Sequence, residues 1–164
     1  MKIVMSDKVY VQRNDLAYLM KSCEGKEIPA SVINKVFSTI FICNESNRYE
    51  FLEFSDPIEI EFFKNLEYSV DYMELRDKCV DEIIELGVSI SEKMNEIAKK
   101  FNALDEQEKA SNLSLIDEHE LLEFKMYSLR DIAWLKQGKL KMKLPKGAKE
   151  PNMIQRFFKK LQRR

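Results

Sequence analysis

The chain has 164 residues, of which 45% are hydrophobic and 34% charged, and its net charge at pH 7 is −1. This composition excludes a disordered chain, and the small numbers of glycine and proline, four of each, favour long regular elements with few loops. No stretch approaches the ~20 apolar residues of a membrane-spanning helix and the apolar run near the N-terminus is too short for a signal peptide, so we predict a cytoplasmic protein.

The small net charge hides a strong separation of charge along the chain. Residues 136–164 contain eleven lysines and arginines and a single acid, Glu150, which gives this segment a charge of +10. The preceding residues contain 16 basic and 27 acidic side chains and therefore carry −11. A block of like charge at one end of a chain is typical of a segment that interacts with a partner.

The first third of the chain is predicted to form a small α+β unit over 1–66. Apolar residues that alternate with polar ones predict a strand or a small hairpin over 2–12. A continuous β-type run over 39–43, turn residues over 44–47 and an alternating run over 49–54 predict a second hairpin. Capping residues and apolar spacing predict three helices, over 15–23, 29–37 and 57–66.

A long helical hairpin is predicted over 71–136. Apolar residues step by three or four from Leu75 to Phe101, which predicts one helix over 71–102 that continues through Gly87. A second helix is predicted over 115–136, antiparallel to the first because the polar connection between them is short. The stripe from Leu75 to Phe101 is close to a coiled-coil seam, and it has two interpretations: packing within the hairpin, or a homodimer.

The basic segment 137–164 is predicted to contain three parts. The alternating sequence at 139–144 predicts a strand, Pro145 and Gly147 predict a hinge, and Pro151 opens an amphipathic helix. The apolar face of that helix contains Met153, Ile154, Phe157, Phe158 and Leu161. The candidate residues for binding an anionic surface or a partner are Lys139, Lys141, Lys143, Lys146, Arg156, Lys159, Lys160, Arg163 and Arg164.

The sequence contains none of the motifs that would indicate a catalytic, metal or cofactor site. The only histidine, His119, lies in an acidic stretch without the repeated Glu-x-x-His pattern of a di-iron bundle. The glycines are too scattered for a phosphate-binding loop, and Cys23, Cys43 and Cys79 form no Cys-x-x-Cys pair. We therefore predict no catalytic residues, no metal and no cofactor, and expect the cysteines to be small buried hydrophobic residues.

These observations predict an α+β, mainly helical protein that is not an enzyme and acts as an interaction or adaptor protein. The acidic helical body would bind a protein partner or a second copy, and the basic segment 139–164 would bind an anionic surface. Three interpretations of that segment stay open: docking on the protein's own acidic body, binding to nucleic acid, and binding to an anionic membrane. The absence of aromatic residues in 136–156 weighs against binding of a single-stranded nucleic acid. Two alternative functions are a nucleic-acid-binding accessory factor and an enzyme of unidentified type.

Overall fold

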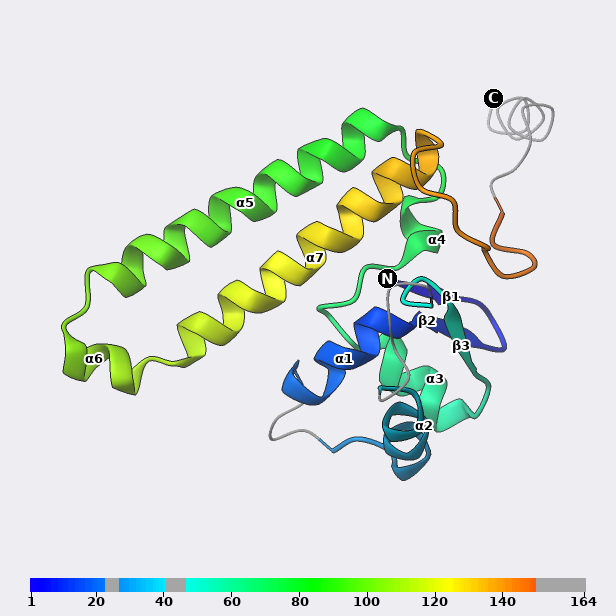
Figure 1. The fold of residues 1–164 in the computed structure, drawn as a ribbon, viewed down its shortest axis with the longest axis horizontal. Coiled ribbons are helices and arrows are strands. Elements are labelled where there is room, and N and C mark those ends of the chain that lie inside the picture. Colours follow the sequence, from blue (N-terminus) through cyan, green and yellow to red (C-terminus); the bar gives the residue numbers. More distant parts are fainter. Residues whose placement is uncertain (23–26, 41–46, 150–164) are drawn as a thin grey trace.

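A computed structural model describes residues 1–22, 27–40 and 47–149 of the chain (Figure 1). It confirms a mainly helical α+β fold. The strands are β1 (Lys2–Val4), β2 (Val9–Gln12) and β3 (Phe51–Phe54). The helices are α1 (Arg13–Ser22), α2 (Ala30–Ile40), α3 (Pro57–Lys64), α4 (Tyr72–Leu75), α5 (Val80–Asn102), α6 (Glu106–Ser111) and α7 (Ser114–Lys136).

The three strands form one antiparallel sheet in the order β1-β2-β3. The predicted strand over 2–12 is a hairpin whose turn is closed by a hydrogen bond from Met5 N to Lys8 O at 2.9 Å. On the other edge of β2, Tyr10 pairs with Glu53 of β3. Among the described residues, β3 therefore pairs with β2, which is distant in the sequence.

The prediction of a strand from residue 39 is wrong for the first two residues of that run. Thr39 and Ile40 belong to the last turn of α2, and residues 41–43 lie outside the described part of the chain. Val32, Val36 and Thr39 are buried at helical spacing, and the Thr39 hydroxyl donates to Lys35 O at 2.6 Å. The buried helical stripe thus outweighs the preference of β-branched residues for strands.

The predicted helix over 71–102 is interrupted between Leu75 and Val80, where the structure has α4, a short connection and then α5. Asp71 caps α4 by accepting a hydrogen bond from Met73 N at 3.0 Å. The Glu82 carboxylate accepts from Cys79 N at 2.7 Å and so caps the start of α5. Each of the two helices thus has its own N-terminal cap, and the second cap starts a new helix although the apolar spacing continues across the connection.

Helices α5 and α7 lie side by side and run in opposite directions, with α6 in the connection between them (Figure 1). The helix α6 lies in the stretch that was predicted only to be a polar connection. Its start carries a capping box in which Glu108 N donates to Asp105 Oδ1 at 2.8 Å and Asp105 N donates to Glu108 Oε2 at 3.0 Å. The spacing Asp-x-x-Glu was thus the signal for this helix.

Helix α5 continues through Gly87, as the sequence analysis preferred. A Cβ at this position would meet no atom within 4 Å. We therefore expect Gly87→Ala to raise the free energy of unfolding by about 0.5–1 kcal/mol, because alanine removes the entropic cost of glycine in a helix. Gly138→Ala is the control, since φ is +72° there and a side chain would be strained. Urea denaturation would measure both, and a loss of stability in Gly87→Ala would contradict the prediction.

Two clusters of buried side chains hold the fold together. The sheet–helix core joins β2, β3 and the first three helices, and it comprises Val9, Val11, Leu16, Leu19, Val32, Val36, Phe54, Ile60, Phe63, Leu66, Tyr68 and Phe124. The hairpin core joins β1, α4, α5 and α7, and it comprises Met1, Ile3, Tyr72, Leu75, Ile83, Leu129, Ile132, Ala133 and Ala148. The two clusters connect the sheet to the long helices: Phe124 of α7 packs in the sheet–helix core, and Ile3 of β1 packs in the hairpin core.

The cysteines do not share one environment. Cys79 is exposed at the start of α5, so the expectation that it is buried is wrong for this residue. It lies at the N-cap position, where the chain enters α5 from the surface connection after α4. Cys23 and Cys43 lie outside the described residues.

Lysine 2 has a structural role that the sequence did not indicate. Its ammonium group is buried and donates to three carbonyl oxygens at the C-terminal end of α3, those of Phe63, Lys64 and Leu66, at 2.6, 3.3 and 2.9 Å. Burial lowers the pKa of Lys2, and the nearby carboxylate of Asp71 opposes that shift. A cation at this end of a helix interacts favourably with the helix dipole, so Lys2 ties β1 to α3.

Candidate anion-binding face

The segment 139–149 leaves α7 and lies along the sheet-bearing side of the molecule (Figure 1). Gly138, with φ of +72°, ends the helix, and the amides of Lys139 and Leu140 both donate to Trp134 O at 2.9 and 3.2 Å. Downstream, Ala148 N donates to Pro145 O at 3.1 Å, and the Ala148 side chain is fully buried in the hairpin core. Both ends of the segment are therefore fixed to the body.

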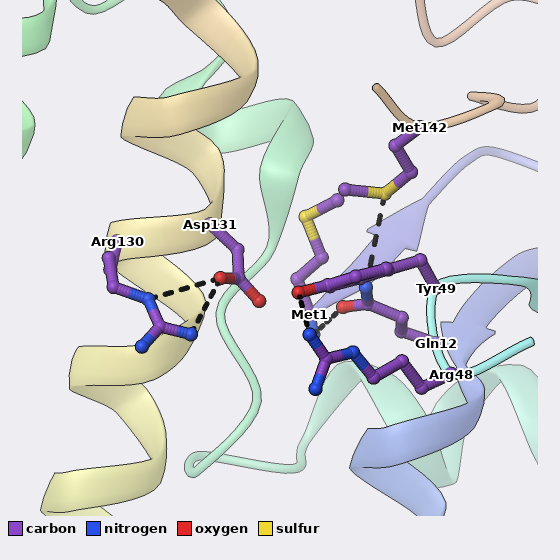
Figure 2. A network of polar contacts seen from close by, with 7 residues as sticks. All are labelled: Met1, Gln12, Arg48, Tyr49, Arg130, Asp131 and Met142. Carbon is purple, nitrogen blue, oxygen red and sulfur yellow. Dashed lines mark hydrogen bonds and ion pairs between the residues drawn. The ribbon is translucent and has the colours of Figure 1, made fainter. Parts of the chain in front are cut away.

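The predicted strand over 139–144 is wrong, because no residue of this range is in the sheet. The alternation of apolar and polar residues has a different cause. Met142 and Leu144 pack against the hairpin core, and the Gln12 amide donates to Met142 Sδ at 3.9 Å (Figure 2). Alternate side chains are thus buried by contact with the body, without a neighbouring strand.

This packing leaves five lysines exposed, which we call the lysine row: Lys139, Lys141, Lys143, Lys146 and Lys149. All five are exposed, and among the described residues none of their ammonium groups forms an ion pair. Cations that have no carboxylate partner keep their full charge available to a ligand.

A groove of about 580 Å³ runs beside the lysine row. One wall is residues 141–146, and the other is formed by Tyr10 and by Tyr49, Glu50 and Phe51. The only acid of the groove, Glu50, lies 3.2 Å from the guanidinium Nε of Arg13, so its charge is already compensated. The groove therefore combines aromatic rings with lysines that form no ion pair with any described residue.

Tyrosine 10 is neutral in this groove at physiological pH. Partial burial raises the pKa of its hydroxyl group, and a hydrogen bond with Glu53 raises it further. Glu53 in turn forms an ion pair with Lys8 at 3.4 Å. The Glu53 carboxylate is thus shared between Tyr10 and Lys8.

An arginine–tyrosine pair lies on the sheet side of the groove. The Arg48 guanidinium is 4.7 Å from the centroid of the Tyr49 ring, and its Nη2 donates to the Tyr49 hydroxyl at 3.0 Å. In Figure 2 the buried Asp131 carboxylate points toward this pair, while its Oδ1 accepts from Arg130 Nη2 at 3.0 Å. Arg48 itself is exposed, so its cation is available at the edge of the groove.

A second arginine–aromatic arrangement lies at the start of the lysine row, on the last turns of α7. The Arg130 guanidinium is 4.6 Å from the centroid of the Trp134 ring and 5.1 Å from that of the Tyr127 ring. Trp134 and Tyr127 are each 40% exposed. Since the Trp134 carbonyl accepts from the amide of Lys139, this pair adjoins the first lysine of the row.

Sequence reasoning found only part of this face. Lys139, Lys141, Lys143 and Lys146 were predicted, and the structure displays them on one side of a single segment. The other predicted residues lie outside the described part of the chain, and they are Met153, Ile154, Arg156, Phe157, Phe158, Lys159, Lys160, Leu161, Arg163 and Arg164. The arginines and aromatic residues that border the row were missed, since only the tertiary fold brings Tyr49 next to Lys141–Lys146.

Two other hollows on the described surface are less suited to a ligand. A cleft of about 420 Å³ contains Lys2 and Asp71, but Lys2 is bonded to the end of α3 and Asp71 caps α4. Burial raises the pKa of Asp71, which fits its structural position. An open hollow of about 930 Å³ beside α3 is lined mainly by apolar residues and by Glu27 and Glu61.

Among the described residues, no group of three or more histidine, cysteine, aspartate or glutamate side chains could hold a metal ion. No described helix combines the length and apolar character that crossing a membrane requires. Comparison of the chain with protein-family models, curated proteins and solved structures finds no match. The properties of the candidate face therefore rest on its geometry and charge.

Proposed function

We propose that this protein is a non-enzymatic interaction protein that binds an anionic polymer through the lysine row and the arginines beside it. The observation that carries this proposal is the alternate packing of 139–149, in which Met142 and Leu144 anchor the segment and the lysines face solvent. In a solvated tail the charged groups would have no fixed positions in space. A segment fixed to the body presents them in one line, which reduces the entropic cost of binding an extended anion.

An extended anion fits this face better than a small one. The exposed lysines are spread along the whole of 139–149 and are not grouped at neighbouring positions. A small anionic substrate would need several donors directed at the same atoms, often with a helix N-terminus behind them. The arrangement of the lysine row therefore favours binding of an extended anion over catalysis.

The described part of the face supports a polymer over a membrane surface. Peripheral binding to anionic membranes normally combines cations with apolar side chains that enter the interface. Here Met142 and Leu144 face the hairpin core, so the lysine row has no apolar wedge of its own. The membrane interpretation depends on Phe157 and Phe158, which lie outside the described residues, and it stays a prediction.

The homodimer through the Leu75–Phe101 stripe also stays a prediction. Ile83 and Ile97 of this stripe are buried within a single chain, where α5 packs along α7. Pairing of two copies through the same residues would require the two helices to separate. The acidic helical pair remains available as a surface for a protein partner, which is the other half of the proposed adaptor role.

The salt concentration that elutes the protein from immobilised heparin tests the proposed function. We expect retention at low salt and earlier elution of Lys141→Gln/Lys143→Gln, since each lost contact removes released counterions from the binding equilibrium. Point variants are preferable to deletion of 139–164, which would also remove the buried Ala148 from the hairpin core.

A matched control is Lys99→Gln/Lys100→Gln, which removes the same charge from exposed positions at the end of α5 distant from the lysine row (Figure 1). This control should elute with the wild type. Equal effects of the two double variants would show that net charge alone governs retention. Failure of the wild type to bind at low salt would refute the proposed function.

A further inference from the structure

We infer that the anionic polymer is a single-stranded nucleic acid, whose phosphates follow the lysine row and whose bases stack at the two arginine–aromatic pairs, Arg48–Tyr49 and Arg130–Trp134. This inference rests on the proposed function and assigns the chemical class of its partner. Heparin, polyphosphate and acidic peptides match the charge of the row, but they have no flat aromatic group to place on the exposed rings. The distinction therefore depends on the rings and on where they lie relative to the lysines.

The phosphate contacts follow from the extended geometry of the segment. Alternate residues of an extended chain lie about 6.6 Å apart on the same side. Lys141 and Lys143 alternate with the partly buried Met142 and Leu144 in the manner of such a chain, whereas the chain bends at Lys139 and Leu140. That spacing is close to the separation of neighbouring phosphates in an extended single strand, so consecutive lysines can each meet one phosphate.

The base contacts follow from the position of Tyr49. Its ring lines the same groove as Lys141–Lys146, and the Arg48 guanidinium lies 4.7 Å from its centroid. Single-stranded nucleic acids are bound in this manner, with the backbone along cations and the unstacked bases on aromatic rings or guanidinium planes. The Arg48–Tyr49 pair offers both kinds of surface at the edge of the groove.

Trp134 offers a second stacking position at the beginning of the row. It is 40% exposed, and Arg130 lies 4.6 Å from the ring centroid. An exposed ring beside a guanidinium group presents two flat surfaces on which a base can stack. A strand that follows the row from Lys146 toward Lys139 would meet the Arg48–Tyr49 pair in the groove and reach Trp134 at the end of α7.

A duplex fits this face poorly. Sequence reading in the major groove needs a protruding helix or β-ribbon, whereas the lysine row is an extended segment held against the body. The stiff, regular phosphate surface of a duplex would also approach the acidic body, since residues 1–135 carry a charge of −11. A flexible single strand can follow the lysine row without approaching the acidic body.

The experiment uses the fluorescence of Trp134, which is the only tryptophan in the chain. The full-length protein is titrated with a thymidine oligonucleotide and, separately, with inorganic polyphosphate. We expect the oligonucleotide to quench the fluorescence and polyphosphate to bind without comparable quenching. Tyr49→Leu should weaken the oligonucleotide by about tenfold and leave polyphosphate affinity unchanged, because only the stacking contact is lost.

Two variants complete the design. Trp134→Leu, followed by the anisotropy of a labelled oligonucleotide, should weaken binding by a factor similar to that of Tyr49→Leu. It also provides a test that does not depend on the half-buried Tyr49, should that variant fail to fold. Phe37→Leu is the matched control, since Phe37 is a 48% exposed aromatic residue of α2 that does not line the groove, and it should bind like the wild type.

The outcomes separate this inference from the proposed function. Equal binding of both polyanions without selective quenching, together with unchanged affinity in the Tyr49 and Trp134 variants, would overturn the inference and leave the proposed function intact. Tighter binding of polyglutamate than of the oligonucleotide would overturn it in favour of an acidic protein partner. If no polyanion binds at low salt, both proposals fail.

Discussion

Ile83→Ala is expected to lower the free energy of unfolding by about 2–4 kcal/mol. Ile83 is only 1% exposed and belongs to the hairpin core, where it lies with Ile132 of α7. Truncation removes buried apolar surface and leaves a cavity that the two long helices can fill only in part. Urea denaturation followed by circular dichroism would measure the change.

The neighbouring residue of the same helix is the control. Ile84 is 50% exposed, so Ile84→Ala should change the free energy of unfolding by no more than about 0.5 kcal/mol. Comparable losses in the two variants would mean that α5 does not bury the face described here. A wild-type stability that rises with protein concentration would instead support the coiled-coil homodimer, because association then contributes to folding.

Phe63→Ala is expected to be at least as damaging, with a loss of about 3–5 kcal/mol. The Phe63 side chain is fully buried in the sheet–helix core, and its ring centroid lies 4.5 Å from that of Phe54 and 5.1 Å from that of Phe62. For a chain of this length, each kcal/mol corresponds to roughly 2–4 °C in Tm. Phe37→Ala, at a 48% exposed position of α2, should leave Tm nearly unchanged.

Both substitutions should move the same unfolding transition. The two cores share elements, because Phe124 of α7 packs in the sheet–helix core while Met1 and Ile3 pack in the hairpin core. Loss of either core therefore weakens the surface that supports the other. Separate transitions, one shifted by Phe63→Ala and the other by Ile83→Ala, would contradict this coupling.

The helices were predictable where apolar spacing and capping agreed. Helix α7 was expected over 115–136 and occupies Ser114–Lys136, and α5 continues through Gly87 because its apolar phase does not change there. The errors arose where other interactions stabilised the same residues in a conformation different from the predicted one. Around 76–79 the apolar spacing continued although Cys79 and Glu82 cap the start of a new helix there. At Thr39 the burial of a helical stripe outweighed β propensity.

The charge of the candidate site was predictable from the sequence, but the full set of residues that form the site was not. The excess of lysines in 139–149 is a property of the local sequence, so counting residues was enough to find it. The alternation at 140–144 was visible too, but its cause was misread: Met142 and Leu144 are partly buried against the hairpin core, which the local pattern does not specify. Tyr49 joins the lysine row through a tertiary contact that no spacing in the sequence indicates, whereas Trp134 adjoins the row through a local hydrogen bond of its carbonyl with Lys139 N.

The most direct test of the polyanion-binding face is the affinity for a thymidine oligonucleotide as a function of salt concentration. The slope of log affinity against log salt changes by about 0.7 for each phosphate that a single strand loses as a contact. We expect Lys141→Gln/Lys143→Gln to have a slope shallower than that of the wild type by about 1.4, and Lys99→Gln/Lys100→Gln to have the wild-type slope. Identical slopes for the wild type and both variants would show that the lysine row does not contact the polyanion.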